Sequence, residues 1–124
     1  DSVLGHITTF RRHPVSCAAG ANAFNILLEE KLFETAGEKE KLFRKHLNHP
    51  RIKEIRGRGL LLAVELGNAE FMHKLVKTSM ENGIVTDWFL FCDTAIRISP
   101  ALNITENEIE LACSRLLKAI DQVI

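Results

Sequence analysis

The sequence has no excess of charge of either sign. Its 16 lysines and arginines balance 16 aspartates and glutamates, so the formal net charge of the 124 residues is +0. A balanced charge gives no electrostatic reason to expect nucleic acid or an anionic membrane as partner. No apolar run approaches the roughly 20 residues that a membrane span needs. The first residues also lack the basic start and apolar core of a signal peptide, so we expect a cytoplasmic protein.

Clusters of reactive side chains are equally sparse. Cys17, Cys92 and Cys113 are widely spaced without a CxxC pair, and the five histidines are scattered. We therefore predict no metal site and interpret the cysteines as buried, reduced thiols. No paired carboxylates, Ser/His/Asp set or phosphate-binding loop stands out, and none of the eight lysines has a context that marks a Schiff-base residue. We predict no catalytic residue in this chain.

The chain does contain clear helix and strand patterns. Hydrophobic residues make up 46% of it, which suits a globular domain with its own core. Helical spacing predicts helices over 14–35, 38–47, 69–82 and from about 105 onward, and apolar runs predict strands over 52–56, 60–66, 84–86 and 95–98. This order, α-α-β-β-α-β-β-α, predicts the α+β class, with helices packed on a small sheet.

Local signals refine this outline. Pro14 suits the first turn of a helix, and Gly37 is a plausible helix end. Gly57 and Gly59 predict a tight hairpin or a bulge between two strands. Thr105 and the glutamate three residues later form a capping-box pattern. The aromatic run 88–91 is interpreted as core or interface in preference to a substrate wall.

Three separated motifs have a more specific content. They are Gly5-His6-Ile7-Thr8-Thr9-Phe10, Arg56-Gly57-Arg58-Gly59-Leu60 and Ile96-Arg97-Ile98-Ser99-Pro100. In this order they resemble the C-terminal part of the class III pyridoxal-phosphate aminotransferases, which include the acetylornithine and ornithine aminotransferases. The resemblance reaches across nearly the whole chain.

The resemblance implies a fold and a function. It implies an extended arm over 1–13, followed by the small C-terminal domain of a fold-type I enzyme over 14–124, with a small, mostly antiparallel sheet. The large domain and the Schiff-base lysine would precede the chain, so the chain alone would be inactive. The parent enzyme would be a homodimer that uses pyridoxal 5'-phosphate. It would transfer an amino group from an amine or amino acid, such as acetylornithine or ornithine, to 2-oxoglutarate.

The resemblance also assigns site residues. Thr8 and Thr9 would contact the phosphate of the cofactor in the other subunit, and Arg97 would bind a substrate carboxylate. Arg11 and Arg12 depart from the family pattern, because two glycines usually stand there. Arginine makes glycine-type dihedral angles costly, although its charge attracts phosphate.

A second interpretation needs no missing domain. Composition and periodicity are equally compatible with a stand-alone α+β binding or regulatory module that holds an anion at the basic N-terminal arm. The three motifs favour the aminotransferase. A sequence upstream of Asp1 that encodes a large domain would distinguish the two.

Overall fold

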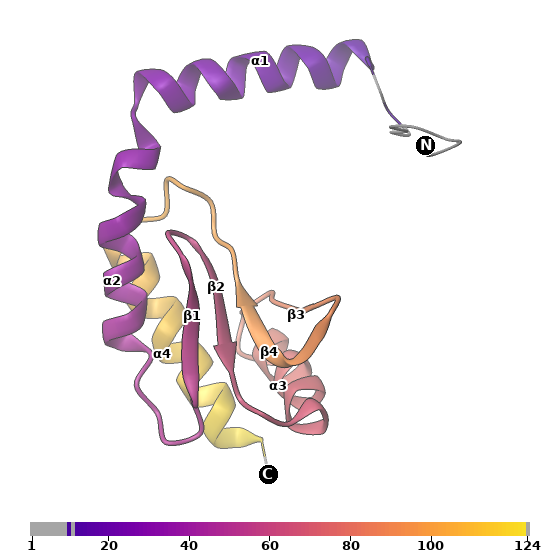
Figure 1. The fold of residues 1–124 in the computed structure, drawn as a ribbon, viewed down its shortest axis with the longest axis vertical. Helices are drawn as coiled ribbons and strands as arrows, with labels where there is room; N and C mark the ends of the chain where they lie inside the picture. The colour runs from indigo at the N-terminus through magenta and orange to yellow at the C-terminus, as the bar shows by residue number, and fades with distance from the viewer. Residues whose placement is uncertain (1–9, 11, 124) are drawn as a thin grey trace, which may run out of the picture. The chain divides into compact units, whose positions relative to one another are not determined.

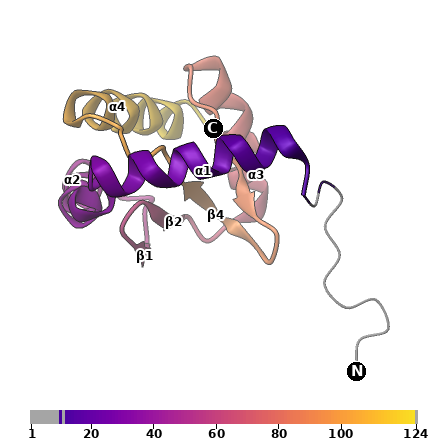
Figure 2. The same ribbon diagram turned by 90° about the horizontal axis from the view of Figure 1, so that it is seen from above.

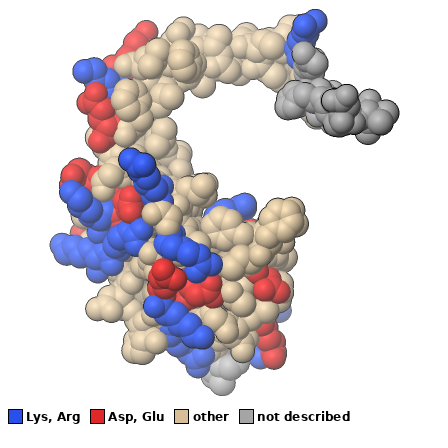
Figure 3. All heavy atoms as spheres, in the orientation of Figure 1, with Lys and Arg blue, Asp and Glu red and all other residues tan. Residues whose placement is uncertain are grey.

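The first helix, α1 (Pro14–Glu29), lies in the first of two units into which the chain divides, Asp1–Phe33 and Glu34–Ile124. The computed structural model describes Phe10 and residues 12–123 (Figure 1). Pro14 occupies the first turn of α1, where a missing N–H costs nothing. None of the helix residues is buried, and α1 carries little charge along its length (Figure 3). The surface of α1 is therefore largely apolar.

The helix predicted over 14–35 is interrupted earlier than expected. After α1, Lys31 has a φ of 50°, in the left-handed region that commonly ends helices. A short 3₁₀ helix, η1 (Leu32–Thr35), follows, and α2 (Ala36–His46) starts directly after it. Gly37 therefore lies inside α2, and its prediction as a helix end was wrong. The helix ends where Lys31, and not a glycine, takes the left-handed conformation.

The second unit contains a four-stranded antiparallel sheet in the order β1-β2-β4-β3. Its strands are β1 (Glu54–Arg58), β2 (Leu61–Glu65), β3 (Trp88–Phe89) and β4 (Cys92–Ile98). Two further helices, α3 (Ala69–Glu81) and α4 (Glu106–Gln122), complete the unit. The predicted α+β class, with helices on a small antiparallel sheet, is confirmed. No helix in the described range is long and apolar enough to cross a membrane.

One face of the sheet is covered by helices. Figures 1 and 2 show α3 and α4 on the same side of the sheet, with α2 beside β1. Leu62 and Val64 of β2 and Ile96 of β4 have no exposed surface and join the core under these helices. Alternation along β2 therefore turns Leu61, Ala63 and Glu65 to the opposite face, which no helix of this unit covers.

The hairpin predicted between the first two strands is confirmed, with Gly59 in its turn and Gly57 inside β1. Arg58 pairs with Leu61, so Gly59 and Leu60 make a two-residue turn, and Gly59 has a φ of 60°. Gly57 has a φ of 127°, which side chains of L-residues rarely allow. A Cβ atom at Gly57 would also lie 2.2 Å from the backbone oxygen of Leu61. The Arg-Gly-x-Gly pattern thus has a steric basis in the hairpin.

The strand predicted over 84–86 was wrong. The segment before β3 is not a strand, and the strand itself comprises Trp88 and Phe89. The N–H of Ile84 donates instead to the carbonyl of Ser79 at the end of α3, at 2.8 Å. Val85 is 93% exposed. A β-branched run can therefore resemble a strand while its backbone hydrogen bonds serve a helix end.

Glu40 and Arg44 attach α2 to the hairpin. Arg44 Nε donates to Glu40 Oε1 at 2.9 Å, and its two Nη atoms donate to the carbonyls of Ile55 and Gly57. Glu40 Oε2 accepts from the N–H of Gly59 at 2.6 Å. The Gly59 N–H, followed by the Arg44 guanidinium, lowers the pKa of Glu40 below its ordinary value of 4.5. The ionised carboxylate is therefore the form that the fold stabilises.

The capping box at the start of α4 is confirmed. The Thr105 side chain accepts from the N–H of Glu108 at 3.3 Å, and the Glu108 carboxylate accepts from the N–H of Thr105 at 2.8 Å. These hydrogen bonds lower the pKa of Glu108. Each partner satisfies an N–H that the helix leaves free, so the predicted helix start is correct.

The predicted burial of the cysteines was wrong for Cys17, which is exposed on α1. Cys92 is half-buried and Cys113 is buried in α4, where burial raises the pKa of its thiol to about 12. Cys17 lies on a helix without a buried residue, so helical periodicity alone could not predict its exposure.

Gly57→Ala should destabilise the chain by about 2 kcal/mol or more, because the new Cβ would meet the Leu61 carbonyl at a disfavoured φ. Gly37→Ala is the control: nothing lies within 4 Å of its Cβ position, and alanine favours a helix by about 1 kcal/mol over glycine. Urea unfolding followed by circular dichroism measures both. Equal stability of the two variants would contradict the hairpin geometry.

Acid should weaken the attachment of α2 to the hairpin. Since the pKa of Glu40 is lower in the folded chain, its stabilisation is complete above the ordinary value of 4.5 and is lost as the pH falls through the folded value. Glu40→Gln should therefore reduce the loss of stability between about pH 6 and pH 3. Glu38→Gln, on the exposed face of α2, is the control. An unchanged acid profile for Glu40→Gln would refute this role.

Candidate functional site

Arg97 lies near the end of β4, on the sheet face that the helices of its unit leave uncovered. It pairs with Ala63 of β2, and its own N–H donates to the carbonyl of Asp87 at 2.8 Å. Its neighbours Ile96 and Ile98 belong to the core or pack against it, so alternation turns Arg97 outward. Its side chain is exposed, and its guanidinium forms no hydrogen bond or ion pair within the described residues.

A hollow of about 500 Å³ lies beside Arg97 on this face. It is lined by Arg56, Ala63, Phe89, Leu90, Phe91, Cys92 and Arg97. The small side chain of Ala63 separates the two arginines, because it pairs with Arg56 on one side and Arg97 on the other. Two arginines, a small residue and an apolar wall form a place where an organic carboxylate could bind.

Arg56, the second arginine of this face, is already paired. Its Nη2 lies 2.8 Å from Glu65 Oε2 and 3.3 Å from the sulfur of Cys92. Hydrogen bonds from Thr94, Arg56 and the N–H of Gly67 lower the pKa of Glu65, and the bond to Glu65 raises the pKa of Arg56. Arg56 thus links neighbouring strands, whereas the Arg97 guanidinium has no such partner in the part of the chain that the structure describes.

The aromatic run 88–91 divides between core and surface. Trp88 packs against the core, and its ring is in edge-to-face contact with that of His73, with 4.6 Å between the ring centroids. Phe89 lines the hollow, while Leu90 and Phe91 are 86% and 97% exposed. The interpretation as core holds for Trp88 alone. The sequence favours core or interface over a substrate wall for the run that contains Phe89, and it does not single out Ala63, because lining the hollow depends on strand register.

The proposed phosphate contacts, Thr8 and Thr9, lie outside the described residues, as does Arg11. Arg12 is described and has a φ of 61°, in the left-handed region that favours glycine. The backbone therefore takes a glycine-type conformation where the sequence has an arginine in place of the expected glycine. Among the described residues, no group of three or more His, Cys, Asp or Glu side chains is arranged to hold a metal.

A second cavity, of about 220 Å³, lies where α2 and α4 meet β4 and the segment before β3. Its wall is mainly apolar and includes the buried thiol of Cys113, together with Thr86, Arg97 and Ser99. The raised pKa of Cys113 keeps this thiol protonated near neutral pH. The buried thiol therefore adds no charge to the cavity wall.

The family model described as aminotransferase class-III matches residues 2–120, which include all three motifs. The chain belongs to the class III aminotransferase family. It is 36% identical over 118 residues to ornithine aminotransferase 2 of Staphylococcus aureus (strain Mu50), which covers 90% of this chain. It is 35% identical over 122 residues to ornithine aminotransferase of Geobacillus sp. (strain WCH70), which covers 91% of it. The chain spans 28% of the length of both relatives.

Solved transaminase structures have the same fold in this region. A thermostable omega transaminase 6-fold mutant from Pseudomonas jessenii is 30% identical with a TM-score of 0.81, covering 97% of this chain and 29% of that one. Ornithine aminotransferase from Toxoplasma gondii, which has pyridoxal phosphate partially occupying its active site, is 35% identical with a TM-score of 0.74, covering 95% and 29%. The α+β arrangement is thus that of a class III aminotransferase part.

Proposed function

We propose that this chain is the small C-terminal domain, residues 14–124 with an arm at 1–13, of a pyridoxal-phosphate-dependent aminotransferase. The whole enzyme transfers an amino group from an amine or amino acid to 2-oxoglutarate. Arg97 carries the proposal, because its exposed guanidinium has no partner in the described chain and borders the hollow. A guanidinium binds a carboxylate through two parallel hydrogen bonds. The ornithine aminotransferase relatives make ornithine the first amino donor to test.

The cofactor of this proposal is pyridoxal 5'-phosphate, which acts as an electron sink when bound. Thr8 and Thr9 would hold its phosphate in the other subunit, since adjacent hydroxyl groups and backbone N–H groups suit phosphate oxygens. The donor set therefore fits the group chemically. The left-handed backbone at Arg12 supports a close path of this segment past a ligand, as a glycine would allow.

The partners of this proposal are the large domain of the same enzyme and the second subunit of a homodimer, in the cytoplasm. The chain's share of its relatives' length and the uncovered apolar side chains of α1 support it. The lysine that binds the cofactor would lie in the large domain. The 124-residue chain alone would then bring an arm and a carboxylate-binding arginine to a site completed by other parts, and it would be inactive.

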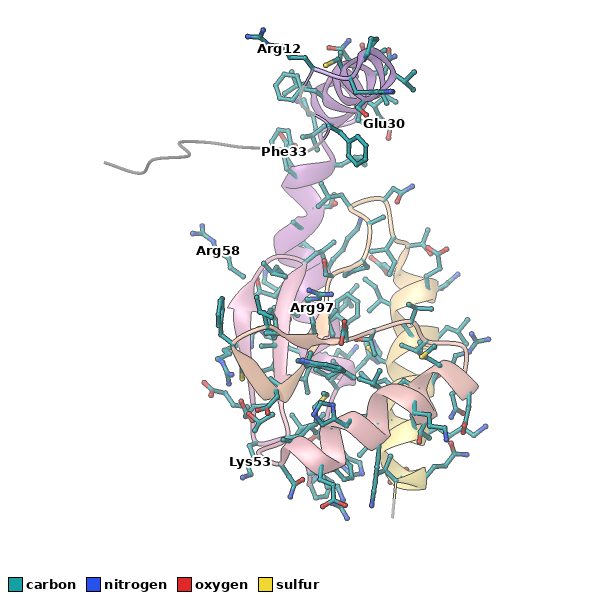
Figure 4. The ribbon with its side chains drawn as sticks, turned by 90° about the vertical axis from the view of Figure 1, so that its right-hand side faces the viewer. Arg12, Glu30, Phe33, Lys53, Arg58 and Arg97 are labelled. Carbon is teal, nitrogen blue, oxygen red and sulfur yellow. The ribbon has the colours of Figure 1, made fainter. Side chains whose placement is uncertain are left out.

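Arg97→Ala in the full-length enzyme should lower kcat/KM for 2-oxoglutarate, because a charged bidentate contact is lost. The loss of transition-state stabilisation should be about 2–4 kcal/mol. Cofactor affinity should change little, since Arg97 contacts the substrate. Arg58→Ala is the matched control: Arg58 is also an exposed arginine of the sheet, but it does not line the hollow (Figure 4). Calorimetric titration with 2-oxoglutarate checks the same contact without turnover. Equal affinities in the two variants would remove Arg97 from the site.

Glycine at the two arginine positions should improve the phosphate contact. Replacing Arg11 and Arg12 with glycine relieves a conformational cost of about 1–3 kcal/mol at the left-handed position. We expect tighter cofactor binding or dimerisation in the full-length enzyme, measured by cofactor titration and sedimentation. Arg12→Ala removes the same charge as Arg12→Gly but keeps a Cβ atom at the left-handed φ, so comparing these two variants separates strain from charge. If the natural Arg-Arg form binds equally well or better, charge outweighs backbone strain.

A further inference from the structure

The backbone of Arg97 is held differently on its two sides. On the β2 side it belongs to a regular antiparallel pairing, opposite Ala63. On the other side it lies beyond the end of β3, which comprises Trp88 and Phe89 and has a shift of register between them. Arg97 N–H still donates to the carbonyl of Asp87 there, at 2.8 Å. This bond continues the ladder by one residue past the strand.

The reciprocal backbone bond is replaced by a side chain. In a regular hydrogen-bonded pair, the N–H of Asp87 would donate to the carbonyl of Arg97. No such bond occurs among the described backbone contacts. Instead, Thr86 Oγ1 donates to the carbonyl of Arg97 at 2.7 Å. Asp87 turns its carboxylate to the N–H of Trp88, at 2.8 Å.

We propose that Thr86 is a positioning residue for Arg97. Its hydroxyl fixes the Arg97 carbonyl, while the Asp87 carbonyl fixes the N–H, so both peptide units that flank the Arg97 Cα are held. The orientation of these units sets the direction in which the side chain leaves the strand. Because the guanidinium has no partner within the described chain, its aim toward a carboxylate depends on the backbone. Thr86 acts through Arg97 and does not touch the substrate.

This inference rests on the proposed role of Arg97 as the carboxylate-binding residue. Bidentate recognition depends on angle as well as distance, so a small rotation of the strand end weakens it. The size of the effect should match the loss of one hydrogen bond. That corresponds to about three- to tenfold in the affinity for 2-oxoglutarate.

The experiment uses the full-length enzyme and four variants. Thr86→Val removes the hydroxyl at nearly constant shape, and Thr86→Ser retains it. Thr78→Val is the matched control, because Thr78 Oγ1 also donates to a backbone carbonyl, that of Lys74 at 3.1 Å, and is also half-buried. Arg97→Ala is the reference. The measurements are the Kd for 2-oxoglutarate by calorimetry, kcat and KM for the same substrate, and Tm.

Thr86→Val should raise Kd and KM for 2-oxoglutarate about three- to tenfold with little change in kcat, as expected for one lost positioning bond. Thr86→Ser should remain within about twofold of the natural enzyme. Thr78→Val should leave Kd unchanged. Equal affinities in Thr86→Val and the natural enzyme, or equal losses in Thr86→Val and Thr78→Val, would overturn the inference while Arg97→Ala still shows its own effect. If Arg97→Ala has no effect on affinity, the proposed function of Arg97 fails and the role of Thr86 fails with it.

Discussion

The two-residue period of the central strands is the constraint on which the candidate site depends. Leu62, Val64 and Ile96 have no exposed surface, and burying each such side chain contributes about 1.5–3 kcal/mol. A slip of one residue would expose this set and bury Arg97, so the register of β2 with β4 is strongly specified. Arg97 faces outward opposite Ala63 because its neighbours face inward.

Two arginines on the uncovered face of the sheet, Arg56 and Arg97, differ in their interactions. Arg56 is held between carboxylates and Cys92, where it joins strands, whereas Arg97 has no partner in the described chain. The difference does not come from residue type, because both are exposed arginines. The difference comes from Glu65, which pairs with Arg56. Glu65 also accepts hydrogen bonds from the N–H of Gly67 and from Thr94. Local acidic partners thus decide which arginine is structural.

The sequence predicted those parts of the fold that depend on local physics. Helical spacing located the helices, the capping box located the start of α4 at Thr105, and two glycines located the hairpin. It failed where tertiary hydrogen bonds decide. The segment 84–86 has strand-forming residues, but its hydrogen bonds are not those of a strand. The N–H of Ile84 donates to a carbonyl at the end of α3, and the Thr86 hydroxyl donates to the carbonyl of Arg97. The predicted stop at Gly37 failed because Lys31 adopts the left-handed conformation instead.

For the candidate site, the sequence could predict a residue but not its surroundings. Arg97 followed from a motif in an apolar strand, whereas Ala63 and Phe89 line its hollow only through the pairing of distant strands. The hydrogen bond from Thr86 to the Arg97 carbonyl likewise depends on the pairing of the segment before β3 with β4. The hydrophobic periodicity of a sequence does not show which distant segments pair with one another.

The guanidinium of Arg44 hinders β-pairing between copies of this chain. β1 is an outermost strand, and such strands present unpaired carbonyls that can template intermolecular β-pairing. Arg44 already occupies the carbonyls of Ile55 and Gly57, two successive acceptors on one side of the strand. An incoming strand would have to displace a charged donor that Glu40 holds in place. The attachment of α2 therefore also disfavours aggregation through the edge strand β1.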